Sequence, residues 1–117
     1  MISNFKLKNK NSLKFLIIRK FVIHGNSMLP TLRSSDIIFA SSLPYLFKKP
    51  RINDIIITKD PRDKRPIIKR IVRIENGRYF LRGDNENEST DSRQFGMIER
   101  KDIRGKVIYA FRGSSML

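Results

Sequence analysis

Short apolar runs separated by polar turns dominate the chain, and they are more typical of strands than of helices. Strand-like runs cover residues 21–23, 37–40, 54–58, 67–74, 78–82 and 106–111. Glu75-Asn76-Gly77 indicates a hairpin between two of them, and Asp60-Pro61-Arg62-Asp63 indicates another turn. Residues 83–95 form a long polar connection. The pattern predicts a small, irregular, mainly antiparallel β domain with little helix.

The N-terminal part of the chain differs from the rest in its charge. Residues 1–20 predict a basic arm or a short helix, and residues 21–117 predict one domain. Lysines and arginines interrupt the apolar stretch over residues 13–23, which therefore fits neither a spanning helix nor a secretory signal. We expect a cytoplasmic or peripherally membrane-associated protein without a transmembrane helix. Docking of the basic segment on a membrane remains an alternative to a solvated arm.

The composition narrows the chemistry that the chain can perform. It contains no cysteine and one histidine, His24, which excludes a thiol nucleophile, a disulfide framework and a cysteine-ligated zinc site. We therefore expect neither a metal nor a cofactor. The 25 lysines and arginines exceed the 11 acidic residues, and the net charge of +14 first favours nucleic acid or an anionic membrane as partner. Because the basic residues are spread along the chain and tryptophan is absent, a nucleic-acid-binding module is only a remote alternative.

One lysine interrupts the apolar pattern of the strand predicted over residues 67–74. Side chains alternate along a strand, so Lys69 shares a face with Ile67 and Ile71. An edge or solvent-facing lysine is the ordinary interpretation. The alternative is a partly buried lysine, because burial lowers the pKa of an amine and makes it usable as a general base near neutral pH.

The segment Gly25-Asn26-Ser27-Met28-Leu29-Pro30-Thr31-Leu32 is the second unusual feature. A tight turn that begins at Gly25 would expose the Ser27 hydroxyl, and the Ser27 N–H could face a substrate carbonyl. An ordinary turn or N-cap serine is the alternative. A hydroxyl nucleophile needs a base, and His24 lies in a predicted strand just before the turn. Lys69 is the better partner, in a Ser–Lys variant of the catalytic triad.

These segments resemble the sequence boxes of the type I signal peptidase family of serine proteases. Residues 25–32 resemble the box G-x-S-M-x-P-T-L, and Lys69-Arg70-Ile71-Val72 resembles K-R-[VI]. Residues 83–96 resemble G-D-N-x-x-x-S-x-D-S-R-x-[FWY]-G, and residues 105–107 resemble the final G-[KR]-[VI]. The resemblance runs from about residue 21 to residue 111. It implies the small β fold of signal peptidases and self-cleaving repressors.

The resemblance implies a role for each matching residue. Ser27 would be the nucleophile, and its N–H would contribute to the oxyanion hole. Lys69 would be the general base and would return the proton to the leaving amine. Gly25 stands where some members have a serine that helps to stabilise the oxyanion, and Ser89 would hydrogen-bond the lysine amine. The other implied residues are an ion pair beneath the site, two residues that hold the loop and two at the substrate pocket: Asp91 with Arg93, Asp84 with Asn85, and Met28 with Pro30.

Most signal peptidases have an N-terminal membrane anchor, and many have a larger second β region. We expect neither in this chain. In this it is similar to the short proteases that mature nickel-type superoxide dismutase. The shared features are residues 60–63 and the run over residues 89–96. Ser34-Ser35-Asp36 and Asn53-Asp54 replace the Pro-Gly-Asp and Gly-Asp turns of the family, which affects the expected loop geometry.

The sequence therefore predicts a serine endopeptidase that removes an N-terminal leader from a precursor protein, in maturation of nickel-type superoxide dismutase. A minimal type I signal peptidase that cleaves exported proteins at a membrane is the alternative. A self-cleaving repressor is less consistent, because the chain shows no DNA-binding domain and no obvious segment to cleave in cis. The expected partner is a precursor or leader peptide; neither nucleic acid nor an obligate oligomer is implied.

Overall fold

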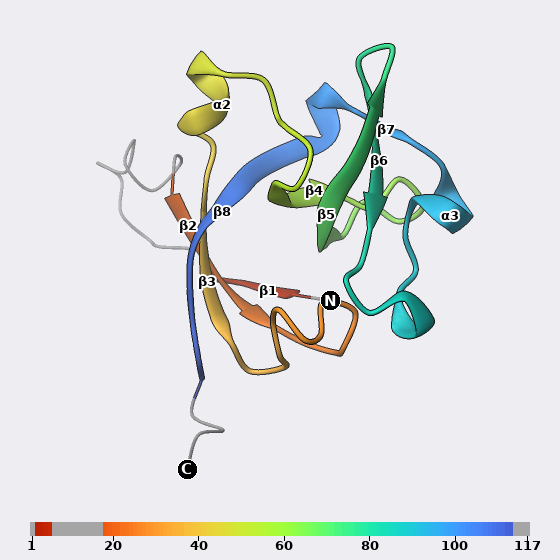
Figure 1. The fold of residues 1–117 in the computed structure, drawn as a ribbon. Helices are drawn as coiled ribbons and strands as arrows, with labels where there is room; N and C mark the ends of the chain where they lie inside the picture. Colours follow the sequence, from red (N-terminus) through yellow and green to blue (C-terminus); the bar gives the residue numbers. More distant parts are fainter. Residues whose placement is uncertain (1, 6–17, 114–117) are drawn as a thin grey trace.

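One antiparallel sheet forms the body of the protein. A computed structural model describes residues 2–5 and 18–113 (Figure 1). The sheet has eight strands in the order β1-β2-β3-β8-β4-β5-β6-β7. Their bounds are β1 Ile2–Phe5, β2 Ile18–Ile23, β3 Ile37–Ser41, β4 Ile55–Lys59, β5 Pro66–Glu75, β6 Arg78–Arg82, β7 Ile98–Glu99 and β8 Ile103–Phe111. Every neighbouring pair is antiparallel, which confirms the predicted mainly β domain.

Within the described residues, helical structure is limited to short turns between strands. The α-helices are α2 (Pro44–Phe47) and α3 (Ser92–Phe95), and the 3-10 turns are η1 (Glu86–Glu88) and η2 (Arg100–Asp102). The α2 turn lies in a segment that the sequence predicted as a loop with an apolar patch. Within the described residues, no helix has the length and apolar character needed to span a bilayer.

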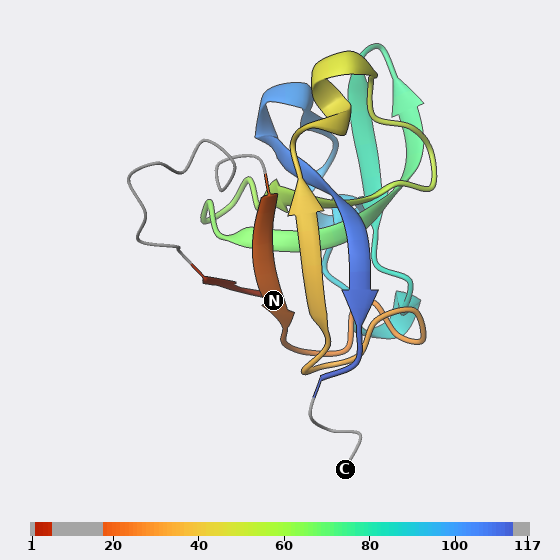
Figure 2. The same cartoon turned by 90° about the vertical axis from the view of Figure 1, so that its left-hand side faces the viewer.

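β8 connects the two halves of the sheet. Its first residues pair with β4, and its later residues pair with β3. The pairing shifts register between Phe39 and Ala40 of β3 and between Ile57 and Thr58 of β4. Such irregularities increase twist and bend a strand. The bent β8 lets β2 and β3 run alongside it while β4 and β5 cross these strands at a steep angle (Figure 2).

The core consists of two clusters with β4 and β5 between them. Ile57 and Ile68 belong to one cluster, which β2, β3 and the turn after β2 complete. Ile56 and Ile71 belong to the other, with residues of α2, β6, β7 and β8. Because successive side chains of a strand point to opposite faces, the run Ile55-Ile56-Ile57 supplies both clusters. The strand that carries Lys69 is therefore enclosed on both faces in its first half.

Several turn residues have positive φ, including two at positions where the resemblance predicts glycine. Asn76 and Gly77 both have positive φ, which confirms the predicted hairpin between β5 and β6. Ser35 and Asn53 replace expected glycines, yet their φ angles of 78° and 79° lie in the left-handed region. A side chain in that region costs about 1–2 kcal/mol relative to ordinary helical backbone. Ser35 and Asn53 therefore place strain in these two loops.

The N-terminal boundary differs from the expectation. β2 begins at Ile18, so residues 18–20 belong to the sheet rather than to the predicted arm or helix, and β1 pairs with β2. The β-branched residues of this stretch favour extended structure once β3 offers a pairing edge. The rest of the predicted short helix, over residues 13–17, lies outside the described residues.

Two neighbouring residues of β5 test the double-sided burial of this strand. The Ile71 side chain is fully buried, whereas Val72 is 36% exposed. Ile71→Ala should lower the free energy of unfolding by about 2–5 kcal/mol, because it leaves a cavity in the second cluster. Val72→Ala, the matched control, should lower it by less than about 1 kcal/mol. Urea unfolding followed by circular dichroism measures both, and equal losses would contradict the arrangement.

Candidate active site

The predicted serine and the predicted lysine meet at one pocket of about 300 Å³. It lies between the turn after β2, the loop between β4 and β5, the start of β5 and the loop after η1. The residues around it are Gly25, Asn26, Ser27, Asp60, Arg62, Asp63, Arg65, Pro66, Ile67, Lys69, Glu88 and Thr90. Ser27 and Lys69 are 42 positions apart in the chain, so the fold and not the sequence brings them together.

Backbone contacts hold the Ser27 turn against the loop after β6. Gly25, at φ 91°, begins the turn in a conformation that favours glycine. The Asn85 N–H donates to the Ser27 carbonyl at 2.9 Å, and the Asn85 side-chain amide donates to the Asn26 carbonyl at 3.1 Å. A Cβ on Gly83 would lie 2.6 Å from the same Ser27 carbonyl, so only glycine allows this approach. Within the described residues, the Ser27 N–H donates to no other group.

Lys69 is the buried lysine that the strand pattern offered as an alternative. It lies opposite Ile56 of β4 and is 4% exposed. Burial lowers the pKa of its amine below the ordinary 10.5, because the charged form loses its hydration. Within the described residues the amine forms no ion pair. A lysine in this state can accept a proton at a lower pH than a lysine in water.

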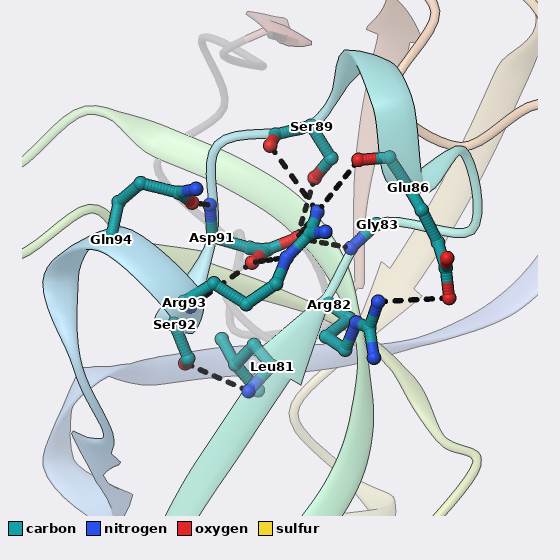
Figure 3. Close-up of polar contacts among 9 residues, drawn as sticks. All are labelled: Leu81, Arg82, Gly83, Glu86, Ser89, Asp91, Ser92, Arg93 and Gln94. Carbon is teal, nitrogen blue, oxygen red and sulfur yellow. Dashed lines mark hydrogen bonds and ion pairs between the residues drawn. The ribbon is translucent and has the colours of Figure 1, made fainter.

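A buried carboxylate, Asp91, organises the loop that follows β6 (Figure 3). It accepts hydrogen bonds from the Gly83 N–H at 2.9 Å, the Ser89 hydroxyl at 2.8 Å and the Arg93 guanidinium at 2.9 Å. Burial alone would raise the pKa of Asp91, but these donors outweigh it and lower the pKa to about 2. Asp91 therefore stays ionised, caps α3 and joins the end of β6 to the loop that follows it.

Asp84 and Arg70 form a second clamp next to the lysine. Two nitrogens of Arg70 donate to the two Asp84 oxygens, each at 2.8 Å, and the Thr31 hydroxyl donates to the same carboxylate. Arg70 also donates to the Asn53 carbonyl at 2.9 Å. The Arg70 hydrogen bonds lower the pKa of Asp84. The clamp fixes the end of the Ser27 turn relative to β5 and β6, which fits the loop-holding role predicted for Asp84.

A third aspartate, Asp60, lies at the same pocket and was missed as a site residue. It is buried and accepts from Arg62 through Nε at 3.0 Å and Nη2 at 2.6 Å, which lowers its pKa. The carboxylates of Asp91 and Asp60 raise the pKa of Lys69, and Arg62 and Arg93 lower it. The Asp-Pro-Arg-Asp sequence signalled only a turn. The effect of Asp60 on the pKa of Lys69 depends on the distance between the two side chains, which their spacing along the chain does not reveal.

Three predicted contacts differ in the structure. Met28 is 1% exposed and packs in the first core cluster instead of lining the pocket, because the turn directs it inward between the sheet faces. Pro30 follows a cis peptide bond and lines a different pocket, beside Arg112. Ser89 donates to Asp91, and no hydrogen bond joins it to Lys69 among the described residues. The predicted ion pair of Asp91 with Arg93 is present at 2.9 Å.

The pocket combines the parts that acyl transfer requires. It presents a hydroxyl, an amine of lowered pKa and a backbone N–H without another acceptor in the described part of the chain. A neutral amine can accept the proton of a hydroxyl that attacks a carbonyl carbon. A backbone N–H can stabilise the negative charge that then develops on the carbonyl oxygen.

Comparisons with known proteins match the chain to a family of peptidases. The family described as "Signal peptidase, peptidase S26" matches residues 12–74 and 72–111. The chain is 34% identical to the mitochondrial ATP-independent inner membrane protease subunit 1a of Arabidopsis thaliana over 116 residues, covering 79% of this chain and 69% of that protein. It is 36% identical to the mitochondrial inner membrane protease subunit 1 of Homo sapiens, covering 73% of this chain and 64% of the relative. It is 24% identical to the probable signal peptidase I-1 of Synechocystis, covering 85% of this chain and 74% of that protein. The matches to the two mitochondrial relatives thus cover only about two thirds of their length.

The pair formed by Asp60 and Arg62 offers a test of the electrostatics. Asp60→Asn removes a carboxylate and leaves the Arg62 cation, so the pKa of Lys69 should fall further. Arg62→Gln leaves the carboxylate without its arginine, so the pKa should rise. Arg65→Gln, at an exposed pair on the same loop, is the matched control and should change little. NMR titration of the lysine side chains measures the pKa of Lys69 in the three variants. Shifts of the same sign in Asp60→Asn and Arg62→Gln would contradict the opposite effects of the two charges.

Proposed function

Because the chain belongs to the signal peptidase family, peptidase S26, we propose that it is an endopeptidase with Ser27 as nucleophile and Lys69 as general base. The family and the class of enzyme, a serine-type peptidase, are those that the sequence motifs predicted. The Ser–Lys dyad and the identity of the substrate stay predictions. The observation that carries the dyad is a buried lysine of lowered pKa at the same pocket as the serine.

The proposed reaction begins with the neutral amine of Lys69. The amine accepts the proton of the Ser27 hydroxyl as Oγ forms a bond to the carbonyl carbon of the scissile peptide. The Ser27 N–H donates to the resulting oxyanion. The Lys69 ammonium then gives its proton to the leaving nitrogen, the C–N bond breaks, and an ester on Ser27 remains. Water hydrolyses this ester, with Lys69 again accepting a proton, and both residues return to their first state.

The proposed substrate is the N-terminal leader of a precursor protein, cut after a small residue. We propose the precursor of nickel-type superoxide dismutase as this substrate, on the sequence features of residues 60–63 and 89–96. Signal peptides of exported proteins are the second candidate, which the family description and the name of the Synechocystis relative favour. We propose that the chain acts in the cytoplasm or peripherally at a membrane. Docking through the basic N-terminal segment stays a prediction, and residues 6–17 of that segment lie outside the described part.

Substitution of the two dyad residues tests the assignment. Ser27→Ala and Lys69→Met should each lower kcat/KM by at least about a thousandfold, because each removes a group needed for the same step. Ser34→Ala and Lys101→Met change an exposed serine and an exposed lysine elsewhere and should cut at the wild-type rate. The assay is cleavage of two synthetic peptides with alanine before the scissile bond, one with a dismutase leader and one with a signal sequence. Wild-type rates for both dyad variants would exclude the dyad, whereas cleavage of only one peptide would identify the substrate class.

The pH dependence provides an independent test of Lys69 as the base. The reactive form is the neutral amine, so kcat/KM should rise with pH as Lys69 loses its proton. Burial lowers the pKa of Lys69, so the midpoint of this rise should lie below 10.5. Arg62→Gln should move the midpoint upward and Asp60→Asn downward, in step with the Lys69 titration. A rate without pH dependence from about 6 to 10 would argue against Lys69 as base.

A further inference from the structure

Acidic residues gather in the two loops beside the Ser27 pocket, which connect β4 to β5 and β6 to α3. Five of them form ion pairs with arginines: Asp60 with Arg62, Asp63 with Arg65, Asp84 with Arg70, Glu86 with Arg82, and Asp91 with Arg93. The remaining one, Glu88, forms no ion pair within the described residues. Glu88 is therefore the carboxylate of these loops whose charge no arginine of the described chain offsets.

The backbone around Glu88 is held in place, while its side chain is exposed. The Glu88 N–H donates to the Asn85 carbonyl at 3.1 Å. The Arg93 guanidinium donates to the carbonyls of Glu86 at 2.9 Å and Ser89 at 3.4 Å, one before and one after Glu88 in the chain (Figure 3). At the side chain, the Asn85 amide donates to Glu88 Oε2 at 3.4 Å, which is a long hydrogen bond. The carboxylate thus has a defined position and can accept further donors.

The pocket is locally acidic on a strongly basic protein. Its lining contains three carboxylates and two guanidinium groups, those of Asp60, Asp63, Glu88, Arg62 and Arg65. With Lys69 neutral, as the proposed reaction requires, the lining therefore carries one net negative charge, whereas the chain as a whole carries +14. Lys48 and Lys49, which form no ion pair within the described residues, follow α2, and both views show α2 far from η1 (Figures 1 and 2). The excess of cations is thus not at the pocket.

We propose that Glu88 is a specificity-determining residue that binds a lysine or arginine of the substrate close to the scissile bond. This inference rests on the proposed function, because it places the scissile bond at Ser27. Glu88 and Ser27 line the same pocket, so a peptide with its carbonyl at Ser27 brings a neighbouring side chain near Glu88. A basic side chain there complements the unpaired carboxylate, and an acidic one meets a like charge.

The arginines of the pocket favour an acidic substrate residue less than Glu88 favours a basic one. Arg62 donates to Asp60 through Nε at 3.0 Å and Nη2 at 2.6 Å, and Arg65 donates to Asp63 through Nε at 2.8 Å. An acidic side chain of the substrate would compete with these two carboxylates for the same guanidinium groups. A basic side chain at Glu88 competes with no cation of the described residues.

Peptides that differ in one residue test the preference with the full chain. A parent peptide with alanine before the scissile bond receives lysine, alanine or glutamate at one neighbouring position at a time, on either side of the bond. At the position that contacts Glu88, lysine should raise kcat/KM of the wild type about two- to fivefold over alanine, the effect of one exposed ion pair. Glutamate should lower it. Glu88→Gln should remove the difference between the lysine and alanine peptides, and Glu88→Lys should favour the glutamate peptide.

Glu86→Gln is the matched control. Glu86 belongs to the same turn, η1, but its carboxylate pairs with Arg82 and does not line the pocket. This variant should keep the wild-type preference for the lysine peptide. Added salt should reduce the preference in wild type and in Glu86→Gln, because it screens exposed charges. A preference that Glu86→Gln loses and Glu88→Gln keeps would overturn the assignment.

The outcomes separate this inference from the proposed function. Equal rates on all peptides would overturn the role of Glu88 and leave the peptidase in place. If wild type cuts no peptide, fluorescence anisotropy measures the binding of the same peptides to Ser27→Ala. Tighter binding of a lysine peptide, lost when Glu88→Gln is added, would support the role of Glu88 although the proposed function has failed. Equal or absent binding would overturn both.

Discussion

The burial of one amine among compensated charges is the constraint on which the site depends. The carboxylates of Asp91 and Asp60 each raise the pKa of the Lys69 amine and so favour its charged form. Each carboxylate is also bonded to its own arginine, Arg93 or Arg62, whose charge acts in the opposite sense. Desolvation is then the largest effect on Lys69. The two arginines thus oppose the effect of the two carboxylates on the pKa of Lys69.

The same anchors determine the shape of the loops, so electrostatics and folding are linked. Asp91 draws the Gly83 N–H and the Ser89 hydroxyl together, and this brings the loop after β6 against the Ser27 turn. Asn85 then bonds to the Ser27 carbonyl, an approach that the missing side chain of Gly83 permits. A change at Asp91 therefore alters both the charge near the lysine and the position of the serine. Ser27, the proposed nucleophile, and Lys69, the proposed base, are thus linked by one connected set of contacts.

Sequence reasoning recovered the parts that local pattern determines. Alternation and turn residues gave the antiparallel sheet and the hairpin at Asn76 and Gly77, and the motifs brought out Ser27 and Lys69. The sequence did not predict features that depend on how distant residues come together in space. Asp60 lies nine positions before Lys69, and its influence requires the strand pairing of β4 with β5. Met28 sits within a motif of the site, yet the turn sends its side chain into the core, a direction that no spacing rule contains.

The distribution of charge gives the strongly basic composition a more specific meaning. Around the pocket the arginines Arg62, Arg65 and Arg93 are paired with aspartates, so this end presents little uncompensated charge from them. At the opposite end Lys48 and Lys49 lack such partners among the described residues and stand next to exposed apolar side chains.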